Sequence, residues 1–145
     1  MVKILLSQEQ VNPDEPDCRG RTLSWAAGGG HEGVVKILLG REGVNPDKPD
    51  DGSKTPVWWA SWVGCEGVVK ILLEWTEVHP DRPDNYGKTP LSRAASSGHE
   101  GVVKTLLGRE DVNSDKSDNA GLTPLSYTAR NGQMEWQPCC GSAKR

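Results

Sequence analysis

The sequence predicts an all-α solenoid, in which one helix-turn-helix unit with a protruding finger loop is repeated along the chain. The segment Val-Lys-Ile-Leu-Leu begins at Val2, Val35 and Val69, and a variant of it begins at Val103. These starts are 33, 34 and 34 residues apart, and a form of the tetrad Val-Asn-Pro-Asp follows nine residues after each of them. A fixed period in this range is typical of a linear array of one small supersecondary unit.

Composition agrees with a thin, continuous core and narrows the range of partners. Hydrophobic residues make up 34% of the chain, Phe is absent, and the apolar residues come in short clusters at fixed intervals. The net charge of −3, with mixed signs, argues against a nucleic-acid partner, because such surfaces normally carry a basic stripe. No apolar run approaches the roughly 18 residues of a membrane helix, so we expect no membrane partner either.

The compartment expected from the sequence is a reducing one. The opening MVKILL is too short for a signal-peptide core and lacks a small-residue cleavage site. The four cysteines form no Cys-x-x-Cys pair and no framework of the kind found in secreted domains. We therefore expect a cytoplasmic protein, with the nucleus as the open alternative.

The clearest unit spans 84–117, and its first half predicts a short helix. Thr89 is a natural N-cap, and Pro90 suits the first helical position because that position needs no amide donor. An apolar face follows at Leu91, Ala94 and Ala95. Gly98 then ends the helix, since glycine tolerates the left-handed conformation common just after helices.

The second half of the unit predicts another helix and then a finger. His99 and Glu100 open the helix, with the carboxylate near its positive end. Lys104 is expected to face water, and Gly108 ends the helix. The buried stripe is expected at Val102, Val103, Leu106 and Leu107. The polar turn at 112–118 forms the finger, and the prolines of the earlier copies predict stiff fingers that are unlike strands.

The pattern D-x-x-G-x-T-P-L-x-x-A-A-x-x-G-H-x-x-V-V-x-x-L-L, over 84–107, resembles an ankyrin repeat. Full copies are expected at 17–49, 50–83 and 84–117, with a partial copy at 1–16 and a half copy at 118–132. The Trp-Ala-Ala of 25–27 and the NPDKPD finger are similar to the long ankyrin arrays of filamentous fungi. After Thr-Pro-Leu the family usually has a histidine that pairs with the threonine, and this chain has Ser24, Trp58, Ser92 and Ser126 there.

Both ends depart from the repeat pattern. The chain starts within a second-helix pattern, and neither end carries the polar cap of a terminal repeat, so we expect low stability, fraying from both termini, or end-to-end self-association. Residues 133–145 break the pattern and are expected to form an atypical, disordered tail.

A shifted reading frame restores the repeat pattern in this tail. When the coding sequence is read one base out of frame from Gly132, the tail can spell D-G-V-A-T-L-L and R-E, similar to a second helix. We interpret it as a one-base insertion or deletion near Gln133, or a misplaced gene-model boundary.

Three patterns that suggest chemistry are better explained by the repeat. GGGHEG at 28–33 matches a dinucleotide fingerprint, but a helix pattern rather than a strand precedes it. His31, Cys65 and His99 share one repeat position, but stacked helices lie about 8–10 Å apart, whereas zinc ligands lie about 2 Å from the metal. We expect these to be helix-start residues that hydrogen-bond to the adjacent loop. The Asp-rich fingers lack the spacing of an EF-hand calcium loop. No Ser/His/Asp set or Cys/His pair stands in a context that would activate a nucleophile. We therefore expect no enzyme, no cofactor and no metal.

The tryptophans are the most informative candidates for a binding surface. One ridge between the helices is expected to be half exposed, at Trp25, Trp59, Arg93 and Tyr127. Trp58 and Trp62 occur only in the second copy, four residues apart on its first helix. Tryptophan is both core-forming and enriched in interface hot spots, so two interpretations stay open: these rings bind a partner, or they fill gaps between helices.

The resemblance implies a non-catalytic protein-protein interaction module, a fragment of a larger ankyrin-repeat protein, whose protein partner lies along the concave side formed by fingers and first helices. The candidate partner-binding residues align with the variable sites of the family: Arg19, Arg21, Asp51, Lys54, Trp58, Trp62, Val63, Asn85, Tyr86, Lys88, Ser96, Ser97, Asn119 and Arg130. Similar fungal arrays sit behind signalling or effector domains, which suggests by analogy recognition in defence or self/non-self sensing. The alternative is a structural or vestigial fragment that binds nothing on its own.

Overall fold

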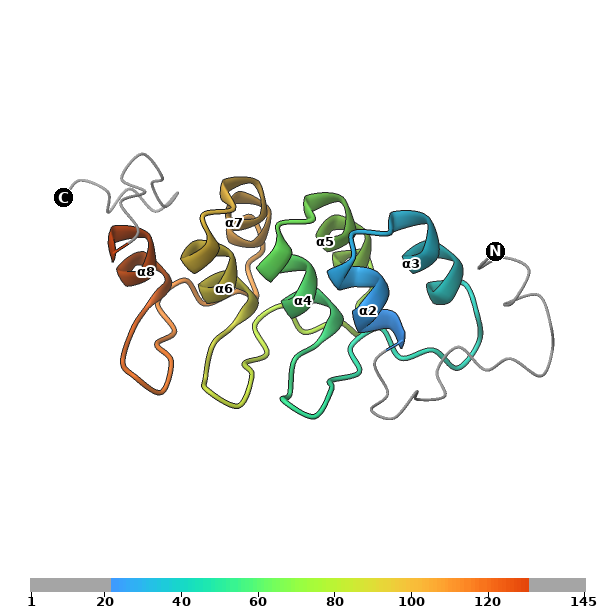
Figure 1. Ribbon diagram of the computed structural model, residues 1–145, viewed down its shortest axis with the longest axis horizontal. Helices are drawn as coiled ribbons and strands as arrows, with labels where there is room; N and C mark the ends of the chain where they lie inside the picture. The colour runs from blue at the N-terminus through green and yellow to red at the C-terminus, as the bar shows by residue number, and fades with distance from the viewer. Residues whose placement is uncertain (1–21, 131–145) are drawn as a thin grey trace.

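The computed structural model describes residues 22–130, and the predicted all-α solenoid is confirmed there (Figure 1). This part of the chain forms helices and no strand: α2 (Thr22–Gly28), α3 (Glu32–Leu39), α4 (Pro56–Val63), α5 (Glu66–Leu73), α6 (Pro90–Ser97), α7 (Glu100–Leu107) and α8 (Pro124–Arg130). The partial copy predicted at 1–16, the tail predicted at 133–145 and the candidates Arg19 and Arg21 lie outside the described residues.

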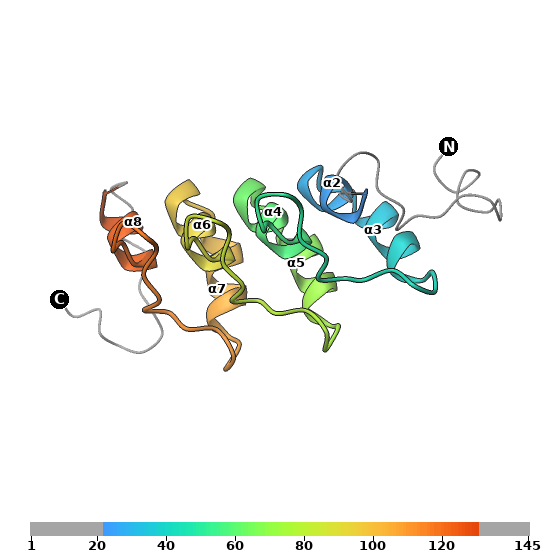
Figure 2. The ribbon, with the colours of Figure 1, turned by 90° about the horizontal axis from the view of Figure 1, so that it is seen from below.

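The helices form two layers, with the first helix of each unit in one and the second helix in the other (Figures 1 and 2). In the first layer α2 packs on α4, α4 on α6, and α6 on α8, and in the second layer α3 packs on α5 and α5 on α7. We call α2–α3, α4–α5 and α6–α7 the first, second and third units, and α8 begins the fourth. The finger loops project to one side of both layers, at the bottom of Figure 1.

Local sequence signals set the ends of the first helices. Thr55 and Thr89 each accept a hydrogen bond from the amide three residues on, at 3.2 and 3.1 Å, and a proline follows each of them. Gly64 and Gly98 end α4 and α6 with φ angles of 85° and 78°, a region in which other residues are strained. The predicted cap, first helical residue and stop of the third unit are therefore confirmed.

Hydroxyl pairs stand where the resemblance implies a Thr–His pair. The Thr89 hydroxyl donates to the Ser92 hydroxyl at 3.2 Å, and those of Thr123 and Ser126 lie 3.0 Å apart. Trp58 occupies the same position in the second unit, where its backbone amide is the group that bonds to the cap threonine. The cap thus survives the loss of the histidine because the threonine needs only a backbone donor.

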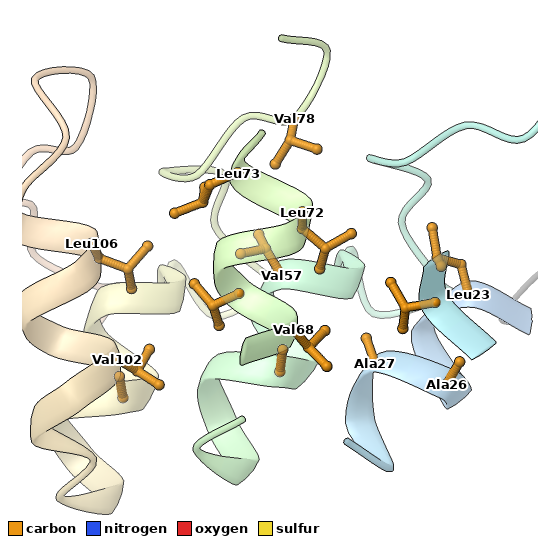
Figure 3. Close-up of a cluster of buried hydrophobic side chains, with 14 of the residues drawn as sticks. Leu23, Ala26, Ala27, Val57, Val68, Leu72, Leu73, Val78, Val102 and Leu106 are labelled. Atoms are coloured by element: carbon orange, nitrogen blue, oxygen red, sulfur yellow. The ribbon is translucent and has the colours of Figure 1, made fainter. Parts of the chain in front are cut away.

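The core is a thin apolar seam between the two layers (Figure 3). Val57 of α4 meets Val68 and Leu72 of α5 there, all fully buried, and Val102 and Leu106 of α7 continue the seam into the third unit. Lys104 is exposed as predicted. The predicted burial of Leu107 is only partly met, since it is half-buried at the edge of the core.

Neighbouring fingers are joined by charged side chains. Asp47 is buried, and its Oδ2 accepts from His79 Nδ1 at 2.7 Å and from Arg82 of the next finger at 3.1 Å. Asp81 repeats the arrangement one unit later, with Lys116 Nζ at 3.8 Å from its Oδ2. The finger aspartates therefore hold successive units in register, although the loops form no strand within residues 22–130.

Candidate functional site

The face shared by the first helices and the loops at 50–55, 84–89 and 118–123 is called the finger surface here. Each loop is closed by an aspartate whose Oδ1 accepts hydrogen bonds from two backbone amides, two and four residues on, at 2.8–3.0 Å. The three aspartates are Asp50, Asp84 and Asp118. These bonds close each loop as an Asx turn and so define the backbone shape of the finger surface.

Three candidate residues, Asp51, Asn85 and Asn119, lie at the exposed tips of these loops. The Asn85 side-chain amide donates to the Asp51 carbonyl oxygen at 3.4 Å, and that of Asn119 donates to the Asn85 carbonyl oxygen at 3.3 Å. The backbone amides of the same asparagines donate to the carbonyls of Gly52 and Tyr86, both at 3.0 Å. These residues therefore join neighbouring loops while still facing solvent.

A groove of about 800 Å³ lies between α6, α8 and the loops that precede them. Six candidate residues line it: Tyr86, Lys88, Ser96, Ser97, Asn119 and Arg130. The side chain of Tyr86 is 66% exposed, which leaves most of its ring open to a partner. The structure thus brings together candidates that the sequence places in two successive units.

The groove is basic. Lys88, Arg93 and Arg130 line it, and none of the three forms an ion pair within residues 22–130. Asp118 is the one acidic residue among the described lining residues, and it is buried. Burial opposes ionisation of Asp118, but hydrogen bonds from the Tyr127 hydroxyl and two backbone amides outweigh it and lower the pKa of this carboxyl. The nearby positive charge of Lys88 lowers this pKa further, so Asp118 is ionised and offsets part of the positive charge. Three cations against this one carboxylate leave the groove positive overall.

The three tryptophans of α4 form one cluster. Trp58 is fully buried, its ring lies 5.4 Å from those of both Trp59 and Trp62, and its Nε1 donates to the Lys88 carbonyl at 3.1 Å. The prediction that Trp58 contacts a partner is wrong, because its ring fills the space between α4 and the next loop. Trp62 is 37% exposed and remains a candidate contact.

An apolar hollow of about 330 Å³ lies beside the cluster, between α2 and α4. Trp25, 60% exposed, lines it with Trp59 and the candidate Val63, which is 43% exposed. The candidate Lys54 holds its ammonium 5.0 and 5.2 Å from the ring centres of Trp58 and Trp59. The finger surface is therefore apolar and aromatic over the first two units and basic over the last two.

Arg93 and Tyr127 were not predicted as contact residues, yet both line the basic groove. The guanidinium carbon of Arg93 lies 5.0 Å from the Trp58 ring and 5.1 Å from the Trp62 ring. Half exposure is confirmed for Arg93, Tyr127 and Trp59 of the predicted ridge, whereas Trp25, at 60%, is more exposed than predicted. The signal that could have identified Arg93 is a charge at a position that is aromatic in the other copies.

The repeated units match one family. A family model of ankyrin repeats (3 copies) matches the chain over residues 1–84, 23–117 and 76–136. The chain belongs to the ankyrin repeat family. Ankyrin repeats are generally protein-protein interaction modules and are typically non-catalytic. No curated protein shows significant similarity to this ankyrin array.

The helix-start position of the array packs against the preceding unit. His99 Nε2 lies 3.0 Å from the Trp62 carbonyl oxygen, a bond to the end of α4 rather than to the predicted loop. Cys65 is half-buried. Burial is the larger cause that raises the pKa of its thiol, and the nearby negative charge of Glu32 raises it further.

In the described part of the array, no three His, Cys, Asp or Glu side chains lie together as metal ligands would. No helix among residues 22–130 is long and apolar enough to cross a membrane.

The pKa of the Tyr127 hydroxyl is expected to lie well above the usual value for tyrosine. Burial, followed by the hydrogen bond to Asp118, raises the pKa of Tyr127 to about 12. Because the folded value exceeds the unfolded value of about 10, the neutral phenol stabilises the fold below pH about 10, and this contribution is lost as pH rises towards 12. Ultraviolet absorbance of the phenolate should show this step and Tyr127→Phe should remove it, whereas a Tyr127 step near pH 10 would contradict the assignment.

Proposed function

We propose that this ankyrin array binds a partner protein on its finger surface and performs no catalysis. The observation that carries the proposal is that six candidate residues, placed by the sequence in successive units, line the basic groove together, and that the candidate Val63 lines the apolar hollow. Stacked repeats present extended surfaces that are suited to such binding. The cytoplasmic setting, the scaffold role and the fungal origin belong to this proposal. The first rests on the cysteine pattern and on the opening MVKILL, and the other two rest on the resemblance.

Trp62 is the expected centre of the contact. It is the exposed member of the α4 cluster, and its ring lies 5.3 Å from Trp59 and 5.4 Å from Trp58. A ring held in place by its neighbours loses little conformational entropy when a partner covers it. Tryptophan is also among the residues most enriched in interface hot spots.

The test is capture of a partner from an extract of the source cells by the wild-type array and by two matched variants. Trp62→Ala should weaken capture by more than about 2 kcal/mol while helicity is retained. Trp75→Ala is the control, because Trp75 is also 37% exposed but follows α5 in the second layer. Equal losses in the two variants, or loss of helicity in Trp62→Ala, would remove Trp62 from the site.

The competing function is a structural or vestigial fragment without binding activity. In that case the wild-type array would retain no protein above the level retained by the support without any array. The same experiment therefore decides between the two functions. Cross-linking of the purified array at increasing concentration separately tests end-to-end self-association, which would appear as a ladder of multiples of the chain.

A further inference from the structure

The third unit breaks a hydrogen-bond pattern that the second and fourth units keep. In the second unit Trp59 Nε1 donates to Asp50 Oδ2 at 3.0 Å, and in the fourth the Tyr127 hydroxyl donates to Asp118 Oδ2. The equivalent oxygen of the third unit, Asp84 Oδ2, is buried and has no hydrogen-bond partner among the described residues. A buried acceptor without a donor is unfavourable, so the third unit gives up stability at this point.

Arg93 is the cause, because it occupies the position of the aromatic donor. Its guanidinium lies over the Trp58 and Trp62 rings, and its Nε is buried without a hydrogen-bond partner in the part of the chain that the structure describes. Two unpaired buried polar atoms in one unit, Asp84 Oδ2 and Arg93 Nε, depart from what stability alone favours. Departures of this kind are typical of positions that serve binding.

We propose that Arg93, Lys88 and Arg130 bind an acidic peptide segment of the partner in the basic groove. This inference rests on the proposed function and adds the chemistry of what the groove takes. The three cations form no ion pair within residues 22–130, and the lining carboxylate of Asp118 is held by Tyr127. The groove is thus locally positive on a chain of net charge −3, which steers an anionic segment to it.

The neighbouring surface favours a peptide over nucleic acid. Beyond the groove of about 800 Å³, Lys54 adds a cation beside the Trp58 and Trp59 rings. The surface around it is aromatic and apolar towards Trp62 and Val63, so the cations do not follow one another as a basic stripe. A phosphate backbone needs a continuous series of cations. An acidic segment with an apolar residue beside it matches both halves of the finger surface.

The substitution Arg93→Tyr separates binding from stability. The new hydroxyl should donate to Asp84 as Tyr127 does to Asp118, so the Tm should rise by about 2–4 °C. At the same time, affinity for a fluorescent octaglutamate peptide, measured by anisotropy at low salt, should fall on the order of ten-fold, because the charge-assisted contact is lost. Added salt should weaken the wild-type binding.

Lys104→Gln is the matched control, because it removes one positive charge from the exposed face of α7. It should leave octaglutamate affinity and Tm unchanged. Three results would overturn the inference: no octaglutamate binding by wild type, equal losses in Arg93→Tyr and Lys104→Gln, or oligodeoxythymidylate binding as tight as octaglutamate binding. A fall in affinity without a rise in Tm would overturn the claim that Arg93 is retained at the expense of stability.

The two proposals fail in different ways. If octaglutamate does not bind but capture of a cellular partner still depends on Trp62, the acidic-segment inference is wrong and the proposed function stands. If neither the peptide nor a cellular protein binds, both are wrong.

Discussion

Trp58→Ala is expected to lower the free energy of unfolding of the array by about 3–5 kcal/mol. The ring is fully buried, packs against two other tryptophans, and reaches the carbonyl of Lys88 in the next loop at 3.1 Å. Its removal leaves a cavity at the contact of two units, and the surrounding helices close it only in part. Urea denaturation followed by far-ultraviolet circular dichroism measures the loss without relying on tryptophan fluorescence.

Trp58→Phe divides this loss into packing and hydrogen bonding. The phenyl ring keeps most of the packing but leaves the Lys88 carbonyl without its indole donor, so we expect a loss of about 1–3 kcal/mol. A Trp58→Ala array that unfolds within about 1 kcal/mol of wild type would show that Trp58 is not a core residue, and the support assigned to Trp62 would then be wrong.

Gly64→Ala is expected to destabilise the array by about 2–4 kcal/mol. Gly64 ends α4 with a φ of 85°, where an alanine is strained by about 1–2 kcal/mol. A Cβ there would also lie 2.5 Å from Nδ1 of His99 and 2.8 Å from its Cγ. The imidazole must therefore move, which breaks its contact with the Trp62 carbonyl and loosens the second unit from the third.

Gly43→Ala is the matched control, because Gly43 has the same φ of 85° and a Cβ there would meet no atom within 4 Å. It should show the conformational strain alone, and the difference between the two variants measures the clash with His99. The double variant Gly64→Ala/His99→Ala should recover the part due to the clash. Equal effects of Gly64→Ala and Gly43→Ala would show that His99 does not link the two units.

The fold was predictable because its signals are local and are repeated. Thr89, Pro90 and Gly98 act on the backbone within one helix, so their roles hold whatever lies beside them. Ser53 shows the limit of such signals. It adopts a φ of 64° at the position where the third unit has Gly87 at 79°, so the stacked neighbouring loops impose the turn on a residue that does not favour it.

The site was only partly predictable, since its geometry depends on residues about one repeat apart. Burial of Trp58 is decided by the loop of the following unit, and the position of Arg93 is decided by rings of the preceding unit. The position of Asn85 in a polar turn predicts exposure correctly, but its bond to Asp51 crosses 34 residues. Sequence distance conceals such contacts, even where the repeat period reveals the fold.

The central claim is that a partner protein lies on the finger surface, and site-specific photo-cross-linking tests it most directly. A photoreactive phenylalanine analogue replaces Tyr86, which is 66% exposed at the rim of the basic groove, or Lys104, which is exposed on α7 in the second layer. Both variants are irradiated in an extract of the source cells, and cross-linked proteins are identified by mass spectrometry. We expect a specific adduct from position 86, lost when Trp62→Ala is added, and none from position 104. The same adduct from position 104 alone would place the partner on the opposite layer and contradict the account.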